Sequence, residues 1–520
     1  MSESVSPSRA RRLCTALIAV FFLLFFVVGS VLFALILLCN PYAGAPLVPS
    51  LLWTLVFLAG LVLFFLLSRR WEPFLRRHSR PLCAGALTLF FCLLLVAGYW
   101  LQTDPIFDVY ALFQGAVELS EAGQLTEQMA YFCQFPNNLG GTLLLSLVFR
   151  LARAVGIADL AAVAVVFNCL LLTAAAGLTY LCARRLWGVR LAMTALLCFL
   201  FGAVFYLSAP IYYTDTLSLC FPILGFYCYL RAKTARTRGG RAAALALTGL
   251  VLAAGFWVKG SVAVLLVAIL LDLLLTLPLR RFALPGFAAV LVFLSCLFLQ
   301  GRVADALLDA QLREQKEIPV QHWIMMGLTG VGAYNADDYD FTLSFPTLEE
   351  RKTADTQRLL ARLRAFTPAS AAQFFATKTV YSFGSGLCGT DTMLDDNPLR
   401  PNWAHAYCLR SGAHFADLAA FAQGQYFAVF LLALAAAVGA LLHRSSARRL
   451  LTPALACFGL LLFLSFWEAS SRYIFNFAPL LLLCAAGGLR TCERWIATRC
   501  RPRPGETTAP PDAAGSTSQP

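Results

Sequence analysis

Long apolar runs separated by short polar segments fill almost the whole chain of 520 residues. An α-helix needs about 20 predominantly apolar residues to cross a bilayer, and most of these runs approach or reach that length. The pattern therefore predicts an all-α polytopic membrane protein built as a bundle of about twelve transmembrane helices. The predicted spans are residues 13–39, 47–67, 82–101, 160–181, 191–207, 217–230, 242–257, 262–277, 282–299, 425–442, 450–466 and 474–489.

Two longer polar segments interrupt this pattern, and both are predicted on the outer side of the membrane. Residues 102–158 contain an apolar piece at 143–155 that is too short to cross the bilayer and carries Arg150 and Arg153. We expect this piece to form a helix lying in the outer interface. Residues 301–421 are less hydrophobic and show mixed helical patterning, which predicts a larger, mostly helical outer segment.

These features predict five parts along the chain. Residues 1–81 hold a polar tail and two spans, and residues 82–300 form a membrane core that includes the outer loop. The outer segment 301–421 follows, and then the last spans at 422–490. Residues 491–520 are expected as a disordered tail in the cytoplasm, because residues 501–520 are rich in Pro, Thr, Ala and Ser.

Composition and charge support a membrane location. Hydrophobic residues make up 59% of the chain and charged residues only 13%, which excludes a soluble protein. A net charge of +13 would suggest nucleic-acid binding in a soluble protein, but most Lys and Arg here fall in short segments that a single topology puts in the cytoplasm. We therefore expect a multi-pass plasma-membrane protein with both termini cytoplasmic and no nucleic-acid partner.

Acidic residues at the outer ends of the spans are candidates for chemistry. Asp104 and Asp108 follow a predicted span, where a carboxylate can act as a general base or bind a cation. Asp215 follows another outward-going span and is also flanked by aromatic residues, so two acids from separate helices are predicted at one face. The alternative is that each is a solvated loop charge. Asp272 lies within an apolar run, where a carboxylate needs a partner.

A turn and several basic residues lie at the same outer boundary. Residues 136–141 (Pro-Asn-Asn-Leu-Gly-Gly) predict a rigid turn before the interfacial helix, with Asn137 or Asn138 capping it; the alternative is a helix N-terminus that faces a phosphate. Basic side chains at a membrane boundary either extend towards water or hold a phosphate. The candidates of this kind are Lys259, Arg472, Arg150 and Arg153. A lone histidine such as His322 is more often structural.

Taken together, these residues resemble the multi-spanning GT-C glycosyltransferases, the superfamily of protein mannosyltransferases and lipid A aminoarabinose transferases, in the manner of bacterial members related to glycosyltransferase family 39. The chain departs from that pattern in its two additional N-terminal spans, in the spacing of Asp104 and Asp108, and in Ser261, which stands where the family usually has proline. The resemblance covers roughly residues 82–490. It rests on Phe107-Asp108-Val109-Tyr110, the turn at 136–141 with the helix that follows, Asp215, Val258-Lys259-Gly260-Ser261, the stretch 320–328 and Ser471-Arg472-Tyr473.

The resemblance implies transfer of a sugar from a polyprenyl-phosphate donor to an acceptor hydroxyl or amine of a cell-envelope glycan, lipid or protein, at the extracytoplasmic face. It implies that Asp108 is the general base and that Asp215 orients the acceptor or supports a cation. Lys259 and Arg472, with Arg150 behind them, would stabilise the leaving phosphate. Metal dependence stays open. The full set of implied substrate-binding residues is Asp104, Tyr131, Asn137, Arg150, Lys259, His322 and Arg472.

Two other functions are compatible with the pattern. About twelve spans is a common number for transporters, although the two similar halves that many transporters show are not evident here. An outer-face glycan polymerase or ligase would instead use His322, Arg362 and Arg364 of the outer segment.

Overall fold

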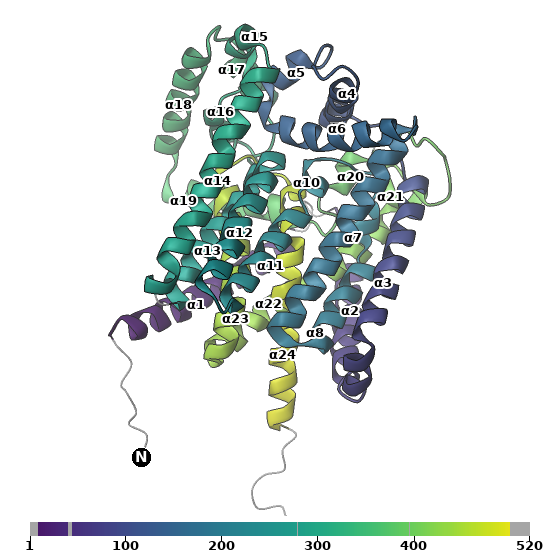
Figure 1. Ribbon diagram of the computed structural model, residues 1–520, viewed down its shortest axis with the longest axis vertical. Helices are drawn as coiled ribbons and strands as arrows, with labels where there is room; N and C mark the ends of the chain where they lie inside the picture. Colours follow the sequence, from purple (N-terminus) through teal and green to yellow (C-terminus); the bar gives the residue numbers. More distant parts are fainter. Residues whose placement is uncertain (1–8, 40–43, 278, 395, 500–520) are drawn as a thin grey trace, which may run out of the picture.

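The computed structural model describes residues 9–39, 44–277, 279–394 and 396–499. In these ranges every element of regular structure is helical, apart from one isolated bridge between Thr103 and Pro398. Long helices run side by side, and a layer of shorter helices covers one end of the bundle (Figure 1). The predicted all-α polytopic membrane protein is confirmed.

Nine of the described helices are long and apolar enough to cross a membrane, and two shorter apolar helices accompany them. The shorter ones are α8 (Val189–Leu200) and the unit formed by η3 (Gly260–Val262) and α13 (Ala263–Thr276). The long ones are α1 (Arg9–Leu38), α2 (Leu47–Leu67), α3 (Glu72–Trp100), α7 (Leu160–Trp187), α12 (Arg238–Val258), α14 (Leu279–Leu307), α22 (Phe415–Leu442), α23 (Arg444–Phe466) and the unit of η4 (Ser471–Phe477) with α24 (Ala478–Arg499).

Two predicted spans are broken rather than continuous. The span predicted at 191–207 consists of α8 and a short α9 (Ala203–Leu207), and the one predicted at 217–230 is preceded by α10 (Thr214–Leu217) and begins as α11 (Cys220–Thr234). Between α9 and α10 the backbone is irregular, and the buried Asn168 of α7 donates to the carbonyls of Ser208, Ala209 and Ile211. Irregular backbone is tolerated at membrane depth when it is buried in protein and satisfied in this way.

The ends of other predicted elements also differ. The helix α3 begins at Glu72, well before the start at 82 that was predicted for this span. The helix α14 continues to Leu307, beyond the end predicted at 299. The buried Asp272 has the partners that its position required, because it accepts from Tyr229 Oη at 2.6 Å and from Lys233 Nζ at 2.8 Å.

The layer of shorter helices is formed by the two polar segments. The first segment gives α4 (Phe107–Glu121), α5 (Met129–Gln134), η2 (Pro136–Asn138) and α6 (Leu139–Ala154). The predicted interfacial helix corresponds to α6, which lies across the end of the bundle (Figure 1). The second segment gives α15 (Ala310–Lys316), α16 (Val320–Met326), α17 (Ala336–Leu343), α18 (Leu348–Ala365), α19 (Pro368–Phe383), α20 (Thr390–Met393) and α21 (His405–Cys408).

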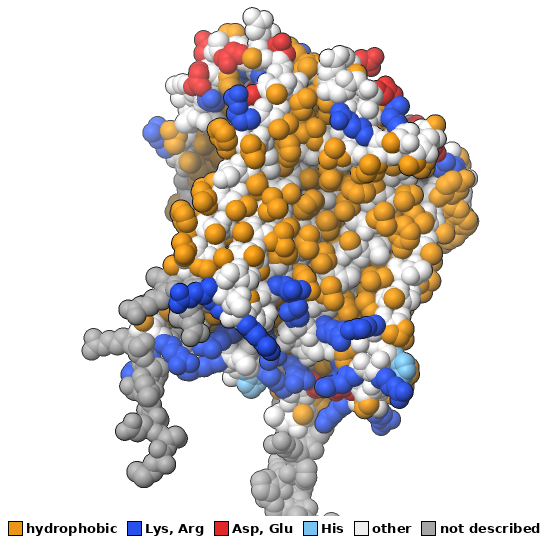
Figure 2. Space-filling model, viewed as in Figure 1, with side chains coloured by type: hydrophobic (Ala, Val, Ile, Leu, Met, Phe, Trp, Pro, Cys, Tyr) orange, Lys and Arg blue, Asp and Glu red, His pale blue; other side chains and the backbone are white. Residues whose placement is uncertain are grey.

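The surface reflects this layering. Figure 2 shows a broad band of hydrophobic side chains between two charged ends. Lys and Arg dominate the end opposite the layer of short helices, and acidic side chains are concentrated on that layer. Such a distribution is typical of a protein that sits across a bilayer.

Candidate active site

Asp108 lies in the first turn of α4, one of the short helices that cover one end of the bundle. Both of its carboxylate oxygens accept tyrosine hydroxyls: Tyr131 donates to Oδ1 at 2.8 Å and Tyr213 donates to Oδ2 at 2.8 Å. Asn138 in turn donates from Nδ2 to the Tyr131 hydroxyl at 2.5 Å. These contacts join four separate elements and fix the direction in which the half-buried carboxylate points.

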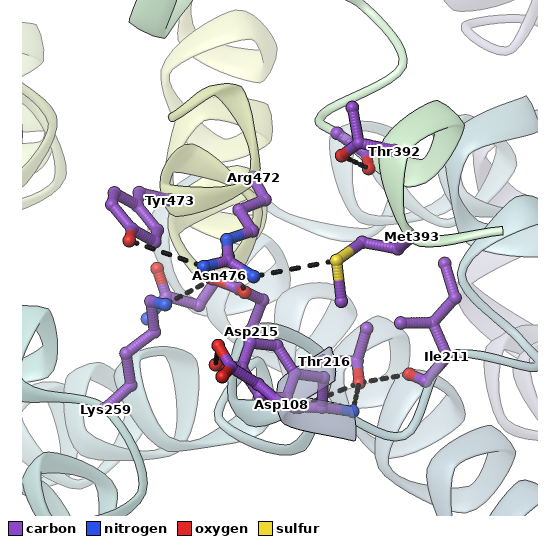
Figure 3. A network of polar contacts seen from close by, with 12 residues as sticks. Asp108, Ile211, Asp215, Thr216, Lys259, Thr392, Met393, Arg472, Tyr473 and Asn476 are labelled. Atoms are coloured by element: carbon purple, nitrogen blue, oxygen red, sulfur yellow. Dashed lines mark hydrogen bonds and ion pairs between the residues drawn. The ribbon is translucent and has the colours of Figure 1, made fainter. Parts of the chain in front are cut away.

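Asp215 lies in α10 and is paired with two cations. Lys259 Nζ is 2.5 Å from Oδ1, and Arg472 Nε is 3.9 Å from Oδ2. The sequence predicted Asp215 in an outward loop, but its side chain is only 7% exposed because the irregular stretch before α10 turns it into the protein. Figure 3 shows Lys259 and Arg472 reaching Asp215 from different elements, with Asp108 close by.

Aromatic rings surround this cluster, defined here as Asp108, Asp215, Lys259 and Arg472. The Lys259 ammonium lies 4.3 Å from the centre of the Tyr473 ring, and the Arg472 guanidinium lies 5.1 Å from the Tyr213 ring. Tyr213 therefore connects the two acids: it donates to Asp108, and its ring contacts Arg472, which pairs with Asp215. Cations over ring faces are stabilised most when they are desolvated, as here.

Glycines allow the elements that carry the cluster to approach one another. A Cβ on Gly140 would lie 2.0 Å from the carbonyl oxygen of Trp257, at the end of α12 that leads into Lys259. This explains the glycine in the predicted turn, because any side chain there would push α6 away from Lys259. A Cβ on Gly389 would lie 2.8 Å from Cβ of Arg472, so the segment before α20 lies directly against that arginine.

Backbone strain is concentrated at the same place. In the described residues, the non-glycine positions with positive φ are Phe107, at 44°, and Cys388, at 49°. Phe107 precedes Asp108, and Cys388 precedes Gly389, whose φ is 73°. Such conformations persist only where the surroundings hold them, and they are enriched at functional sites.

Glu468 is a member of this neighbourhood that was not singled out from the sequence. It is buried, and Tyr473 donates to its Oε2 at 2.6 Å. Burial raises the pKa of Glu468, and the charge of Arg472 opposes that effect. The only available signal was an acid in the short turn before Arg472. Its pairing with Tyr473 depends on the 3₁₀ geometry of η4 and was not visible in the pattern.

Burial also changes the basicity of the site. The pKa of Lys259 is lowered by burial, against the raising effect of Asp215. The pKa of Tyr131 is raised well above its usual value, first by burial and then by the Asp108 charge, so its hydroxyl remains a donor.

Ser261, which departs from the pattern of the similar family, has a partner of its own. Asn476 of η4 donates from Nδ2 to the Ser261 hydroxyl at 3.1 Å and to that of Ser218 at 3.2 Å. These bonds connect the turn after Lys259 with the one that carries Arg472. The departure from proline therefore adds a contact beside the cluster.

Three further predicted site residues make hydrogen bonds to groups outside the cluster. Asp104 is exposed, and its backbone N–H donates to the Asn397 carbonyl. Asn137 donates weakly to Asn138 Oδ1, at 3.4 Å, and neither side chain caps α6, so that expectation was wrong: Asn138 bonds Tyr131 instead. Arg150 donates to the Leu119 carbonyl near the end of α4.

The residues favoured by a polymerase or ligase are held in the layer of short helices. His322 is fully buried and bonds the Thr342 hydroxyl through Nδ1 at 2.7 Å. Arg362 forms a two-pronged pair with Asp338. Within the described ranges, no group of three or more His, Cys, Asp or Glu side chains is arranged to hold a metal ion.

Comparisons with known proteins were made for the sequence and for the structure. A family model described as "Conserved hypothetical integral membrane protein" matches residues 7–492. No curated protein matches the sequence.

Several solved structures are similar to this one, each at 13% identity. The archaeal oligosaccharyltransferase AglB of Archaeoglobus fulgidus, in complex with an inhibitory peptide and a dolichol-phosphate, gives a TM-score of 0.42 over 82% of this chain and 53% of its own. ArnT of Cupriavidus metallidurans in its apo state gives a TM-score of 0.37 over 78% of this chain and 76% of its own. The same protein bound to undecaprenyl phosphate gives a TM-score of 0.34 over 80% of this chain and 78% of its own. The present chain thus spans about half the length of the oligosaccharyltransferase that it matches.

Proposed function

We propose that this chain, which belongs to the family described as conserved hypothetical integral membrane proteins, is a membrane glycosyltransferase that moves a sugar from a polyprenyl-phosphate donor to an acceptor hydroxyl or amine. The observation that carries the proposal is the juxtaposition of Asp108, held by two tyrosine hydroxyls, with the buried Lys259 and Arg472. Transfer from a lipid phosphate needs a base for the acceptor and positive charge for the leaving group.

Asp108 is the group suited to the base role. It takes the proton of the acceptor while the acceptor oxygen or nitrogen attacks the anomeric carbon, and the bond from that carbon to the phosphate oxygen breaks on the opposite side. Tyr131 and Tyr213 occupy one lone pair on each carboxylate oxygen, and an ionised carboxylate offers about four such sites. The remaining sites are available to the acceptor, and the tyrosines restrict the direction of its approach.

Lys259 and Arg472 are suited to hold the leaving phosphate. Lys259 and Arg472 share the carboxylate of Asp215, which offsets one of their two positive charges. Asp215 also keeps both cations in place before the donor arrives, which avoids reorganisation during the reaction. The site lies at one end of the membrane-spanning bundle, so the apolar chain of a donor can remain in the bilayer.

We infer that the site faces the extracytoplasmic side. The end of the bundle opposite the site is rich in Lys and Arg, which supports a cytoplasmic position for that end (Figure 2). The same orientation puts both termini in the cytoplasm.

The test is sugar transfer by the purified protein reconstituted in vesicles, with a set of labelled polyprenyl-phosphate sugars and membrane extract as the acceptor source. We expect label to move to an acceptor from at least one donor, with release of polyprenyl phosphate. Absence of transfer from every donor, together with solute uptake by the same vesicles, would favour a transporter instead.

A further inference from the structure

An apolar cavity of about 490 Å³ lies within the membrane bundle, next to the cluster but not part of it. Its walls come from α1, α2, α8 with α9, α22, α23 and η4 with α24. A volume of this size falls within the range of ligand pockets. Cavities lined by apolar side chains exclude water and accept apolar ligands.

The two additional N-terminal spans form one side of this cavity. Phe25 and Leu32 of α1 and Phe57 of α2 line it, facing Phe205 of α9 and Tyr426 of α22. Both spans are held firmly against α22: a Cβ on Gly424 would lie 2.3 Å from Cβ of Trp53, and one on Gly29 would lie 2.7 Å from Leu434. These two spans, which depart from the pattern of the similar family, thus complete a lined space within the bundle.

Gly60 is an open position in the α2 wall of the cavity. Gly60 lines it, is itself exposed, and a Cβ built there meets nothing within 4 Å. The α2 wall of the cavity therefore has room at Gly60 for a larger side chain.

One end of the cavity lies beside Arg472 of the cluster. Cys388 and Ile474 line that end. Cys388 adjoins Gly389, which packs against Arg472, and Ile474 lies on the same 3₁₀ helix as Arg472. An apolar chain in the cavity would therefore bring its polar head to Arg472.

We propose that this cavity holds the isoprenoid chain of the donor lipid, with the phosphate at Arg472 and Lys259. The inference rests on the proposed function, because that function supplies a lipid with a single apolar chain and a phosphate head. Arg472 at one end of the cavity suits the phosphate head, and the apolar and aromatic walls suit the isoprenoid chain. In this arrangement α1 and α2 help to bind the substrate.

The test compares two glycine substitutions in the full-length protein. Gly60→Phe fills the cavity from an open position, and Gly85→Phe on α3 is the matched control, since it also has nothing within 4 Å of a Cβ and does not line the cavity. Val56→Trp, at a second lining position on α2, guards against an individual folding defect. Binding to nanodisc-embedded protein is measured for undecaprenyl phosphate, for a two-isoprene phosphate and for a dioleoyl phosphatidylglycerol probe.

We expect Gly60→Phe and Val56→Trp to weaken undecaprenyl phosphate binding by about tenfold or more, which corresponds to excluding about two methylene groups from burial. Binding of the two-isoprene phosphate is expected to change little, and Gly85→Phe to change neither. Unchanged binding in both cavity variants would overturn the proposal. The proposal would also be overturned if the phosphatidylglycerol probe bound the wild type as tightly as undecaprenyl phosphate and lost as much affinity in the cavity variants, because the cavity would then be a general lipid site.

Sugar transfer measured in parallel separates this inference from the proposed function. If the cavity variants lose long-chain binding but the wild-type protein transfers no sugar, the assignment of the cavity to the isoprenoid chain is supported and the proposed glycosyltransferase function is contradicted. If the protein transfers sugar but the cavity variants bind the long-chain lipid as well as the wild type does, the glycosyltransferase function is supported and the cavity assignment is contradicted. A wild-type protein that binds no undecaprenyl phosphate would overturn the cavity assignment, and the transfer assay would then decide the function by itself.

Discussion

Lys259 Nζ lies 2.5 Å from Asp215 Oδ1, and both side chains are almost fully buried, at 12% and 7% exposed. The pair joins the end of α12 to α10, and Arg472 approaches the same carboxylate from η4. A buried pair of this kind adds little to stability compared with an apolar pair, but it is expensive to break on one side. This asymmetry gives a direct test of the geometry.

Lys259→Met should destabilise the protein by about 3–5 kcal/mol, because Asp215 loses its close partner and remains buried. The double variant Lys259→Met/Asp215→Asn should be more stable than Lys259→Met alone, since no uncompensated carboxylate is left. Thermal unfolding in detergent of Lys259→Met, Asp215→Asn and the double variant measures the coupling between the two side chains. Simply additive effects would mean that the two side chains do not depend on one another.

Glu468→Gln should lower the pH above which the protein no longer binds the lipid phosphate. Burial lowers the pKa of Lys259, and the negative charge of Glu468 is among the groups that raise it. The protonated lysine is the form that holds a phosphate, so binding weakens as pH rises through that pKa; removing the Glu468 charge lowers the pKa further. Undecaprenyl phosphate affinity measured from about pH 6 to about pH 10 tests the shift.

The control for this pH shift is Asp417→Asn, which removes an acid whose side chain is 76% exposed. Its binding profile should overlay that of the wild type. A Glu468→Gln profile that also overlays the wild type would show that the two groups are not coupled.

Gly140→Ala should destabilise the protein by about 1–3 kcal/mol, as overpacking does. The added methyl would lie 2.0 Å from the Trp257 carbonyl oxygen, and a backbone atom cannot move aside as a flexible side chain can. Thermal unfolding compares it with Gly85→Ala, at an open helical position where alanine should be neutral or slightly stabilising. Equal melting temperatures for the two variants would contradict the close approach of α6 and α12.

Asp355→Asn should stabilise the layer of short helices at neutral pH. Burial raises the pKa of Asp355 to about 6, above the usual value of an aspartate, so the folded state holds the proton more tightly than the unfolded state does. That preference costs stability as pH rises from about 4 to about 6, and the neutral asparagine avoids the cost. The gain in melting temperature should therefore be larger at about pH 7.5 than at about pH 4.5.

Asp340→Asn, at an exposed position of α17, is the control for this gain and should show no such pH dependence. His322, which shares the Thr342 hydroxyl with Asp355, has its pKa lowered to about 4 by burial and is present in both proteins, so its contribution cancels in the comparison. A gain that is larger at the acidic pH would contradict the assignment.

The sequence predicted the architecture well because a bilayer imposes the length and polarity of each span. It also singled out Asp108, Asp215, Lys259 and Arg472, because each of them interrupts the apolar pattern at the end of a run. The structure brings these four together from α4, α10, the end of α12 and η4.

What the sequence missed depends on contacts between distant parts of the chain. The broken stretch between α9 and α10 remains apolar in sequence, and its carbonyls are satisfied by Asn168 from α7. Arg150, which the resemblance implies behind Lys259 and Arg472 at the phosphate, donates to a backbone carbonyl of α4, and that contact leaves no mark in the pattern. Neither a periodicity nor a motif reports such contacts.

The most direct test of the central claim is sugar transfer by Asp108→Asn. Its matched control is Glu127→Gln, which removes an exposed acid of the same outer segment. With folding verified by thermal unfolding, we expect transfer to fall by about a hundredfold or more in Asp108→Asn, the usual size of a general-base contribution, and to stay at the wild-type level in Glu127→Gln. Transfer that persists in Asp108→Asn would contradict the assignment of Asp108 as the base.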